Sequence, residues 1–167
     1  HVGTLPNRAY FIPHADADSA LTGVRVCSER FTLLSGDWNF GYYDSFLDLP
    51  EDLFAPEATP DAIPVPSVWQ CHGYDRHHYT NARFPIPFDP PHVPWDNPCG
   101  LYTRTFQWEA EAGEKATLHF EGVDSCLYVW VNRQFVGYSQ VAHSTSAFDV
   151  TDFVREGENH ISVLVLK

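Results

Sequence analysis

Apolar and polar side chains alternate along several short stretches of this chain, and a two-residue period is typical of a strand with one buried face. The period is clear in residues 101–108, 115–121 and 160–166. Residues 126–131 are apolar on both faces, which indicates a strand with little solvent on either side. Asn132 and Arg133 then predict a turn into a further strand at residues 134–139.

Residues 24–34 and 38–43 are also strand-like, and Ser35, Gly36 and Asp37 between them predict a hairpin turn. Strands of this kind, joined by irregular loops and without β-α-β alternation, predict an all-β fold. We expect an antiparallel sandwich of two sheets.

Two segments do not follow the strand pattern. Residues 46–66 are acidic and interrupted by proline, so we expect a long surface connection with at most one helical turn, at residues 50–54. Residues 148–154 predict a short helical turn capped by Asp149 or Thr151.

A proline-rich segment, residues 66–106, reads PSVWQCHGYDRHHYTNARFPIPFDPPHVPWDNPCGLYTRTF. Proline stands at positions 85, 87, 90, 91, 94 and 98, where it fixes φ and removes a backbone donor. Such a segment forms neither a helix nor a central strand, so it predicts a stiff loop. A stiff loop holds its side chains in place before a ligand arrives, which favours binding.

With 167 residues and 44% hydrophobic content, the chain fits one globular domain. We expect an N-terminal arm at residues 1–23 and the folded domain at residues 24–167. The net charge of -12 argues against nucleic acid or an anionic membrane as a partner, because both need basic patches. A neutral molecule is therefore the kind of ligand that the charge favours. The chain begins at His1 and contains no methionine, which indicates a fragment of a longer polypeptide.

Side chains that often carry catalysis or bind metals lack a fitting pattern here. The acidic candidates lie at turns and strand ends, where carboxylates usually cap backbone N–H groups or face water; they are Asp75, Asp89, Asp96, Glu121 and Asp124. The clustered histidines fit no standard ligand spacing; they are His72, His77, His78 and His92. We therefore expect no catalytic residue, metal site or cofactor in this chain.

The cysteines form no C-x-x-C pair, so neither a zinc site nor a redox motif is indicated. They are Cys27, Cys71, Cys99 and Cys126. We interpret them as buried free thiols. Two disulfides are the alternative, which would imply an oxidising compartment.

Four blocks of the sequence resemble the N-terminal domain of the large, LacZ-type β-galactosidases of glycoside hydrolase family 2. They are the proline-rich segment, FTLLSGDWNFGYYDS at residues 31–45, FEGVDSCLYVWVNRQFVGYSQ at residues 120–140 and GENHISVLVLK at residues 157–167. The resemblance implies a jelly-roll sandwich of the galactose-binding-domain type. It also implies a parent enzyme that hydrolyses terminal β-D-galactosyl bonds with retention. In that family the catalytic glutamates lie in a barrel domain beyond residue 167, so this chain alone is expected to be inactive.

The same resemblance assigns one site residue. In the family, a Tyr-Thr-Asn loop reaches the mouth of the barrel and its Asn binds galactosyl hydroxyls, which here implies a substrate contact by Asn81. A carboxamide suits this role because it both donates and accepts hydrogen bonds without adding charge. The alternative is an Asn that stabilises its own turn.

Aromatic residues of the loop have two open interpretations: a stacking platform for sugar rings, or packing that attaches the loop to its sheet. They are Trp69, Tyr74, Tyr79, Phe84, Phe88 and Trp95. A free-standing lectin-like module, a purely structural domain and a related β-glucuronidase or β-mannosidase also remain alternatives. By resemblance, the parent is expected to use Mg²⁺ and a monovalent cation, to form a homo-oligomer and to be cytoplasmic.

Overall fold

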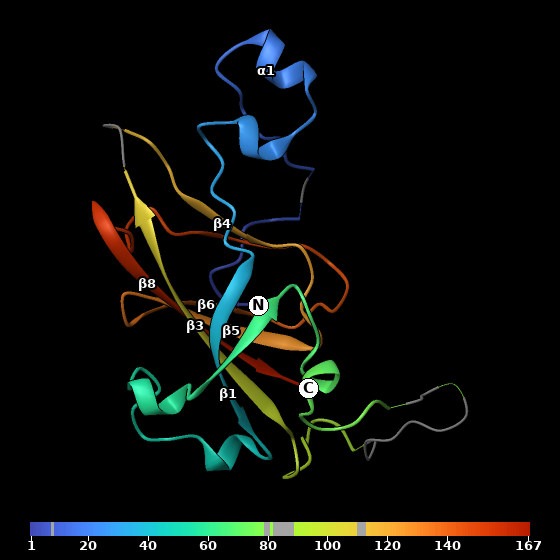
Figure 1. Cartoon of the computed structure of the whole chain (residues 1–167). Coiled ribbons are helices and arrows are strands. Elements are labelled where there is room, and N and C mark those ends of the chain that lie inside the picture. Colours follow the sequence, from blue (N-terminus) through green and yellow to red (C-terminus); the bar gives the residue numbers. More distant parts are fainter. Residues whose placement is uncertain (8, 79–80, 82–88, 110–112) are drawn as a thin grey trace.

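The computed structural model describes residues 1–7, 9–78, 81, 89–109 and 113–167 (Figure 1). The strands are β1 Gly36–Tyr43, β2 Asp61–Val65, β3 Cys99–Trp108, β4 Thr117–Phe120, β5 Cys126–Val131, β6 Gln134–Ser139, β7 Ser146–Asp149 and β8 Gly157–Leu166. The helical elements are α1 Ala17–Leu21 and the 3₁₀ turns η1 Arg25–Cys27, η2 Phe46–Asp48, η3 Pro56–Ala58 and η4 Trp69–His72.

The strands form a six-stranded sheet in the order β2-β1-β3-β8-β5-β6 and a two-stranded sheet of β4 and β7. Every strand pair is antiparallel. The long central strands β3 and β8 pair along their whole length, from Cys99 opposite Leu166 to Trp108 opposite Gly157. The predicted all-β jelly-roll sandwich is therefore confirmed.

The core lies between the two sheets. Phe40 of β1, Phe148 of β7 and Ile161 of β8 are completely buried in one apolar cluster. Burial of a side chain of this size contributes about 1.5–3 kcal/mol. Because the inward residues alternate along each strand, the two-residue period seen in the sequence is the period of this core.

Several predicted elements are confirmed, namely β3, β4, β5, β6, β8 and the strand that begins before Trp38. The hairpin predicted from residues 24–34 is wrong. Val24 and Val26 are exposed, and residues 25–27 form η1 instead of a strand. Gly36 and Asp37 belong to β1, whose partners are β2 and β3.

Two strands fall where connections or a helical turn were predicted. The β2 strand contains Pro64, which is tolerated because β2 lies at the edge of the sheet. The β7 strand occupies the first part of residues 148–154, and a turn begins only after it. In that turn the Asp149 carboxylate accepts hydrogen bonds from the Thr151 N–H at 3.0 Å and the Thr151 hydroxyl at 2.6 Å.

The N-terminal residues run along the sandwich and then leave it. Val2 bridges to Tyr138, and Thr4 bridges to Phe148. Beyond them α1 stands away from both sheets (Figure 1). The Glu121 carboxylate accepts hydrogen bonds from the Tyr10 hydroxyl and the Arg25 guanidinium, so the base of this protruding part is attached to the end of β4. The domain boundary at residue 23 stays a prediction.

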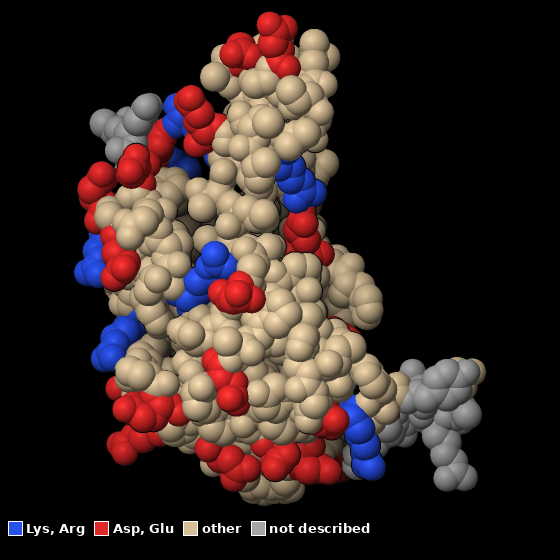
Figure 2. Space-filling model, in the orientation of Figure 1, with Lys and Arg blue, Asp and Glu red and all other residues tan. Residues whose placement is uncertain are grey.

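Acidic side chains gather along the lower edge of the molecule (Figure 2). The segment after β1 supplies exposed carboxylates at Asp44, Asp48, Glu51, Asp52 and Glu57. These carboxylates contribute to the net charge of -12. Within the described residues, no helix has the length and apolar character needed to cross a membrane.

Candidate functional site

Asn81, the predicted substrate contact, is exposed to solvent. It belongs to the loop that leaves β2 after Val65 and returns to the sheet at Cys99. The other two residues of the Tyr-Thr-Asn motif, Tyr79 and Thr80, lie outside the described residues. The exposure of Asn81 is compatible with an external ligand, and its substrate role stays a prediction.

Aromatic packing attaches the first part of this loop to the sheet. Trp69 is buried and stacks on Phe40 of β1 at a ring-centroid distance of 6.5 Å. Tyr74 meets the same Phe40 ring at 5.1 Å and the Tyr42 ring at 5.6 Å. Gly100 faces this cluster, and a Cβ atom there would lie 2.7 Å from the Phe40 ring. The backbone of β3 thus has to approach the aromatic rings closely, which only glycine permits.

These contacts favour the packing interpretation for Trp69 and Tyr74. Trp95 differs, because its side chain is 76% exposed. Its carbonyl accepts a hydrogen bond from the Ser45 hydroxyl at 2.6 Å, so the backbone is held while the ring faces solvent. Tyr79, Phe84 and Phe88 lie outside the described residues.

A salt bridge lies at the base of the loop. The Lys167 ammonium, at the end of β8, binds the Asp75 carboxylate, and the two side chains are only 18% and 11% exposed. Asp75 has a φ of 55°, a left-handed conformation that is uncommon for a non-glycine residue. Burial alone would raise the pKa of Asp75, but the hydrogen bonds from Lys167 and the backbone N–H of Arg76 outweigh it and lower the pKa.

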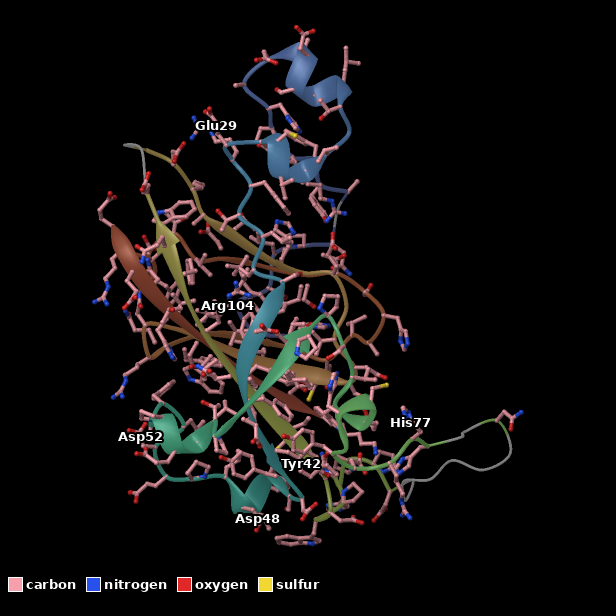
Figure 3. The ribbon with its side chains drawn as sticks, viewed as in Figure 1. Glu29, Tyr42, Asp48, Asp52, His77 and Arg104 are labelled. Carbon is pink, nitrogen blue, oxygen red and sulfur yellow. The ribbon has the colours of Figure 1, made fainter. Side chains whose placement is uncertain are left out.

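Tyr42 borders the same region from the end of β1, and His77 marks where the loop leaves the sandwich (Figure 3). Burial, together with the negative charges of Asp75 and Asp44, raises the pKa of the Tyr42 phenol to about 12. Tyr42 is therefore neutral at physiological pH and acts as a hydrogen-bonding group rather than as a base.

Three of the five carboxylates singled out from the sequence bind other side chains. Asp75 binds Lys167, Glu121 binds Tyr10 and Arg25, and the Asp124 carboxylate accepts from the Ser125 hydroxyl at 3.1 Å. Among the described residues, no group of three or more His, Cys, Asp or Glu side chains is placed to hold a metal ion. The Mg²⁺ and the monovalent cation expected for a parent enzyme stay predictions.

The four cysteines are free thiols in the structure. The prediction that they are buried is wrong for Cys27 and Cys71, which are exposed. It holds for Cys99, whose thiol pKa is raised to about 12, first by burial and then by the charge of Asp48. Such a thiol is not reactive near neutral pH.

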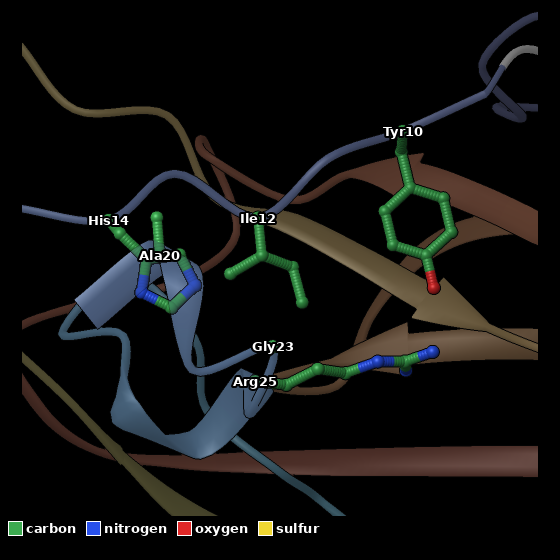
Figure 4. A pocket seen from close by; sticks show the side chains of 6 residues that line it. All are labelled: Tyr10, Ile12, His14, Ala20, Gly23 and Arg25. Atoms are coloured by element: carbon green, nitrogen blue, oxygen red, sulfur yellow. The ribbon is translucent and has the colours of Figure 1, made fainter. Parts of the chain in front are cut away.

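A cavity of about 480 Å³ lies within the N-terminal part of the chain (Figure 4). Its lining residues are Tyr10, Ile12, His14, Ala20, Gly23 and Arg25. The Tyr10 hydroxyl points toward the Arg25 guanidinium, and both groups bind Glu121. The residues that line this cavity belong to the blue segment in the upper part of Figure 1, whereas residues 66–78, in green, lie in its lower half, so the cavity is separate from the first part of the loop.

Sequence reasoning pointed to Asn81, whose role stays a prediction, and did not point to Lys167 or Tyr42. No local pattern indicates either of these two residues. Lys167 and Asp75 are separated by 92 positions, so only the folded chain brings them together.

The fold defines the class of this protein: a jelly-roll β-sandwich domain, in which the first part of the loop after β2 packs against the larger sheet. Residues 31–167 match the model of the glycosyl hydrolases family 2, sugar binding domain. The chain therefore belongs to this family of domains.

Two curated relatives are named β-galactosidase. The one from Actinobacillus pleuropneumoniae is 54% identical over the whole of this chain, and the one from Staphylococcus xylosus is 46% identical over the whole chain. The chain spans only 16% and 17% of the lengths of these two relatives.

Solved structures support the fold. A β-glucuronidase from Faecalibacterium prausnitzii matches with a TM-score of 0.56 and 22% identity, over 80% of this chain and 20% of that one. A β-glucuronidase from an uncultured Clostridium species matches with a TM-score of 0.55 and 18% identity, over 79% of this chain and 21% of that one. At such identities the likeness concerns the fold alone.

Proposed function

We propose that this domain is part of a β-galactosidase and that it contributes Asn81 to the galactosyl subsite of that enzyme. The observation that carries the proposal is the exposed Asn81 on a loop whose base is attached to the sheet by buried aromatic rings and a salt bridge. Under this proposal the catalytic carboxylates belong to another part of a longer polypeptide, since the chain spans only 16% and 17% of the lengths of the two β-galactosidase relatives.

The galactoside class is favoured by the relatives. Those named β-galactosidase reach 54% and 46% identity, whereas the β-glucuronidase structures reach 22% or less. The amide side chain of Asn81 also suits a neutral sugar. An amide matches hydroxyl groups that both donate and accept, whereas a uronic acid would call for a cationic partner.

Replacement of Asn81 by alanine in the full-length polypeptide tests the proposal. Losing one or two hydrogen bonds that strengthen in the transition state costs about 1–3 kcal/mol, so kcat/KM for a β-galactoside is expected to fall roughly 5- to 150-fold. Because the side chain is exposed, the midpoint of thermal unfolding is expected to stay unchanged.

Asn7→Ala is the matched control, since Asn7 is also exposed but belongs to the N-terminal arm. Steady-state kinetics of both variants are compared with those of the unmodified enzyme. An Asn81→Ala variant as active as Asn7→Ala would contradict the proposed contact.

A further inference from the structure

Lys167 contacts the chain on both sides of Asn81 in the sequence, at residues 75–78 before it and at Pro98 after it. Its backbone N–H donates to the Pro98 carbonyl at 3.1 Å, directly before β3 begins. Its ammonium binds the Asp75 carboxylate and lies 3.5 Å from the Arg76 carbonyl, where the loop departs. A single residue at the end of β8 therefore joins the outgoing and the returning segments of the loop.

Contacts with neighbouring residues hold the Lys167 side chain in one conformation. The Nε2 atom of His78 lies 3.4 Å from the ammonium nitrogen, which adds a third contact on the outgoing segment. Because Lys167 and Asp75 are both largely buried, their attraction is screened less than that of a surface pair. Removing the ammonium would leave the Asp75 carboxylate largely buried without its counter-charge, which is costly.

The strand beneath this contact is an interior strand of the larger sheet. The β8 strand is hydrogen-bonded to β3 on one side and to β5 on the other, so Lys167 extends from a rigid element. A group that must meet a substrate within a fraction of an ångström needs such support.

We propose that Lys167 and Asp75 form a clamp that positions Asn81 for the galactosyl group. Lys167 is thus a positioning residue that does not itself touch substrate. The inference rests on the proposed function of Asn81. It adds that the geometry of this contact depends on an ion pair between the end of β8 and the start of the loop.

The test uses Lys167→Met in the full-length polypeptide, because methionine replaces the aliphatic part of the side chain and removes the charge. Displacing a hydrogen-bonding group can lower the reaction rate by up to about 100-fold. We therefore expect kcat/KM for a β-galactoside to fall at least about tenfold. The separate changes in kcat and in KM should be in the same proportion as those of the Asn81→Ala variant. Lys167→Arg, which restores the cation, should recover most of the activity.

Lys115→Met is the matched control, since Lys115 is an exposed lysine before β4 and lies outside this site. We expect it to keep full activity. Equal activity of Lys167→Met and Lys115→Met would overturn the clamp. Where Lys167→Met fails to fold, Asp75→Asn breaks the same ion pair from the other side, with the same expected loss and the same contradicting result.

A double variant separates the clamp from a general structural role. If Lys167 acts through Asn81, the Asn81→Ala/Lys167→Met enzyme should be no less active than Asn81→Ala alone, because the group to be positioned is already absent. Fold-losses that multiply in the double variant would overturn the proposal.

The failure of the clamp and the failure of the Asn81 contact give different results. A drop for Asn81→Ala without a drop for Lys167→Met refutes only the clamp. Full activity of Asn81→Ala refutes the substrate contact, and with it any clamp that serves it.

Discussion

At the scale of single residues, the buried amide of Asn159 shows how this fold uses polar groups in its interior. Asn159 is completely buried near the start of β8. Its Oδ1 accepts hydrogen bonds from the Asn132 amide at 2.8 Å and the Arg155 N–H at 2.9 Å. Its Nδ2 donates to the carbonyls of Arg155 at 2.7 Å and Gly157 at 3.0 Å. All of its hydrogen-bonding capacity is therefore used.

Replacing Asn159 by alanine would remove these bonds and leave buried donors and acceptors without partners. Each such group costs about 1–3 kcal/mol, so we expect the free energy of unfolding to fall by about 2–4 kcal/mol. Urea denaturation of the variant measures this loss. Asn39→Ala, at an exposed position of β1, serves as control with a change below about 0.5 kcal/mol. Equal stabilities of the two variants would contradict the account of the network.

Residue roles could be predicted only where a local motif carries them. Asn81 was proposed through its motif and stays a prediction, whereas the Lys167–Asp75 pair depends on two segments that meet only in the folded chain. Arg104 illustrates the same limit. Its guanidinium donates to the Leu34 carbonyl at 2.8 Å and the Ser35 carbonyl at 3.0 Å, about 70 positions away, and no local pattern around Arg104 indicates these acceptors.

At the scale of elements, the long strands were predictable, whereas two of the short ones, β2 and β7, were not. The β3 and β8 strands have ten residues each, enough for the two-residue period to appear clearly. The β2 and β7 strands have five and four residues. In β2, Pro64 masks the two-residue period of a strand. In β7, the polar residues at both ends, Ser146 and Asp149, mask it. Their existence follows from partners elsewhere in the fold, which the local sequence does not reveal.

The contact between the N-terminal arm and β4 is an element-scale feature with a testable role. Glu121→Gln removes the charge that holds Tyr10 and Arg25. Because the Arg25–Glu121 pair is largely exposed, global stability should change by less than about 1 kcal/mol. Trypsin cleavage after Arg25 should nevertheless become faster, since the arm separates locally from the sandwich. Glu57→Gln, on the acidic edge, should leave the cleavage rate unchanged, and unaltered cleavage in Glu121→Gln would contradict the attachment.

The same contact gives a pH dependence. Hydrogen bonds from Tyr10 and then Arg25 lower the pKa of Glu121 from its ordinary value of 4.5. A lowered folded-state pKa means that the contact stabilises the arm above about pH 4.5 and that this contribution is lost as pH falls through the lower folded-state value. Hydrogen exchange of residues 9–25 should therefore increase, relative to that of β8, only in the acidic range below pH 4.5.

At the scale of the whole molecule, the domain is an acidic sandwich, and the first part of the loop after β2 packs against its larger sheet. Its family is that of the glycosyl hydrolases family 2, sugar binding domain, and it spans about a sixth of the relatives named β-galactosidase. Under the proposed function, this domain supplies the Asn81 amide and the reacting carboxylates come from elsewhere in the longer polypeptide. An amide that is held in place before binding would limit the entropy lost when the sugar binds.

The central claim is that Asn81 reaches from this sandwich to the sugar in the active site of the complete enzyme. A crystal structure of the full-length polypeptide with bound galactose tests it most directly. We predict that an atom of the Asn81 carboxamide lies within about 3.2 Å of a galactosyl hydroxyl oxygen. A galactose bound in the catalytic site with Asn81 beyond hydrogen-bonding reach, directly or through one water, would contradict the account.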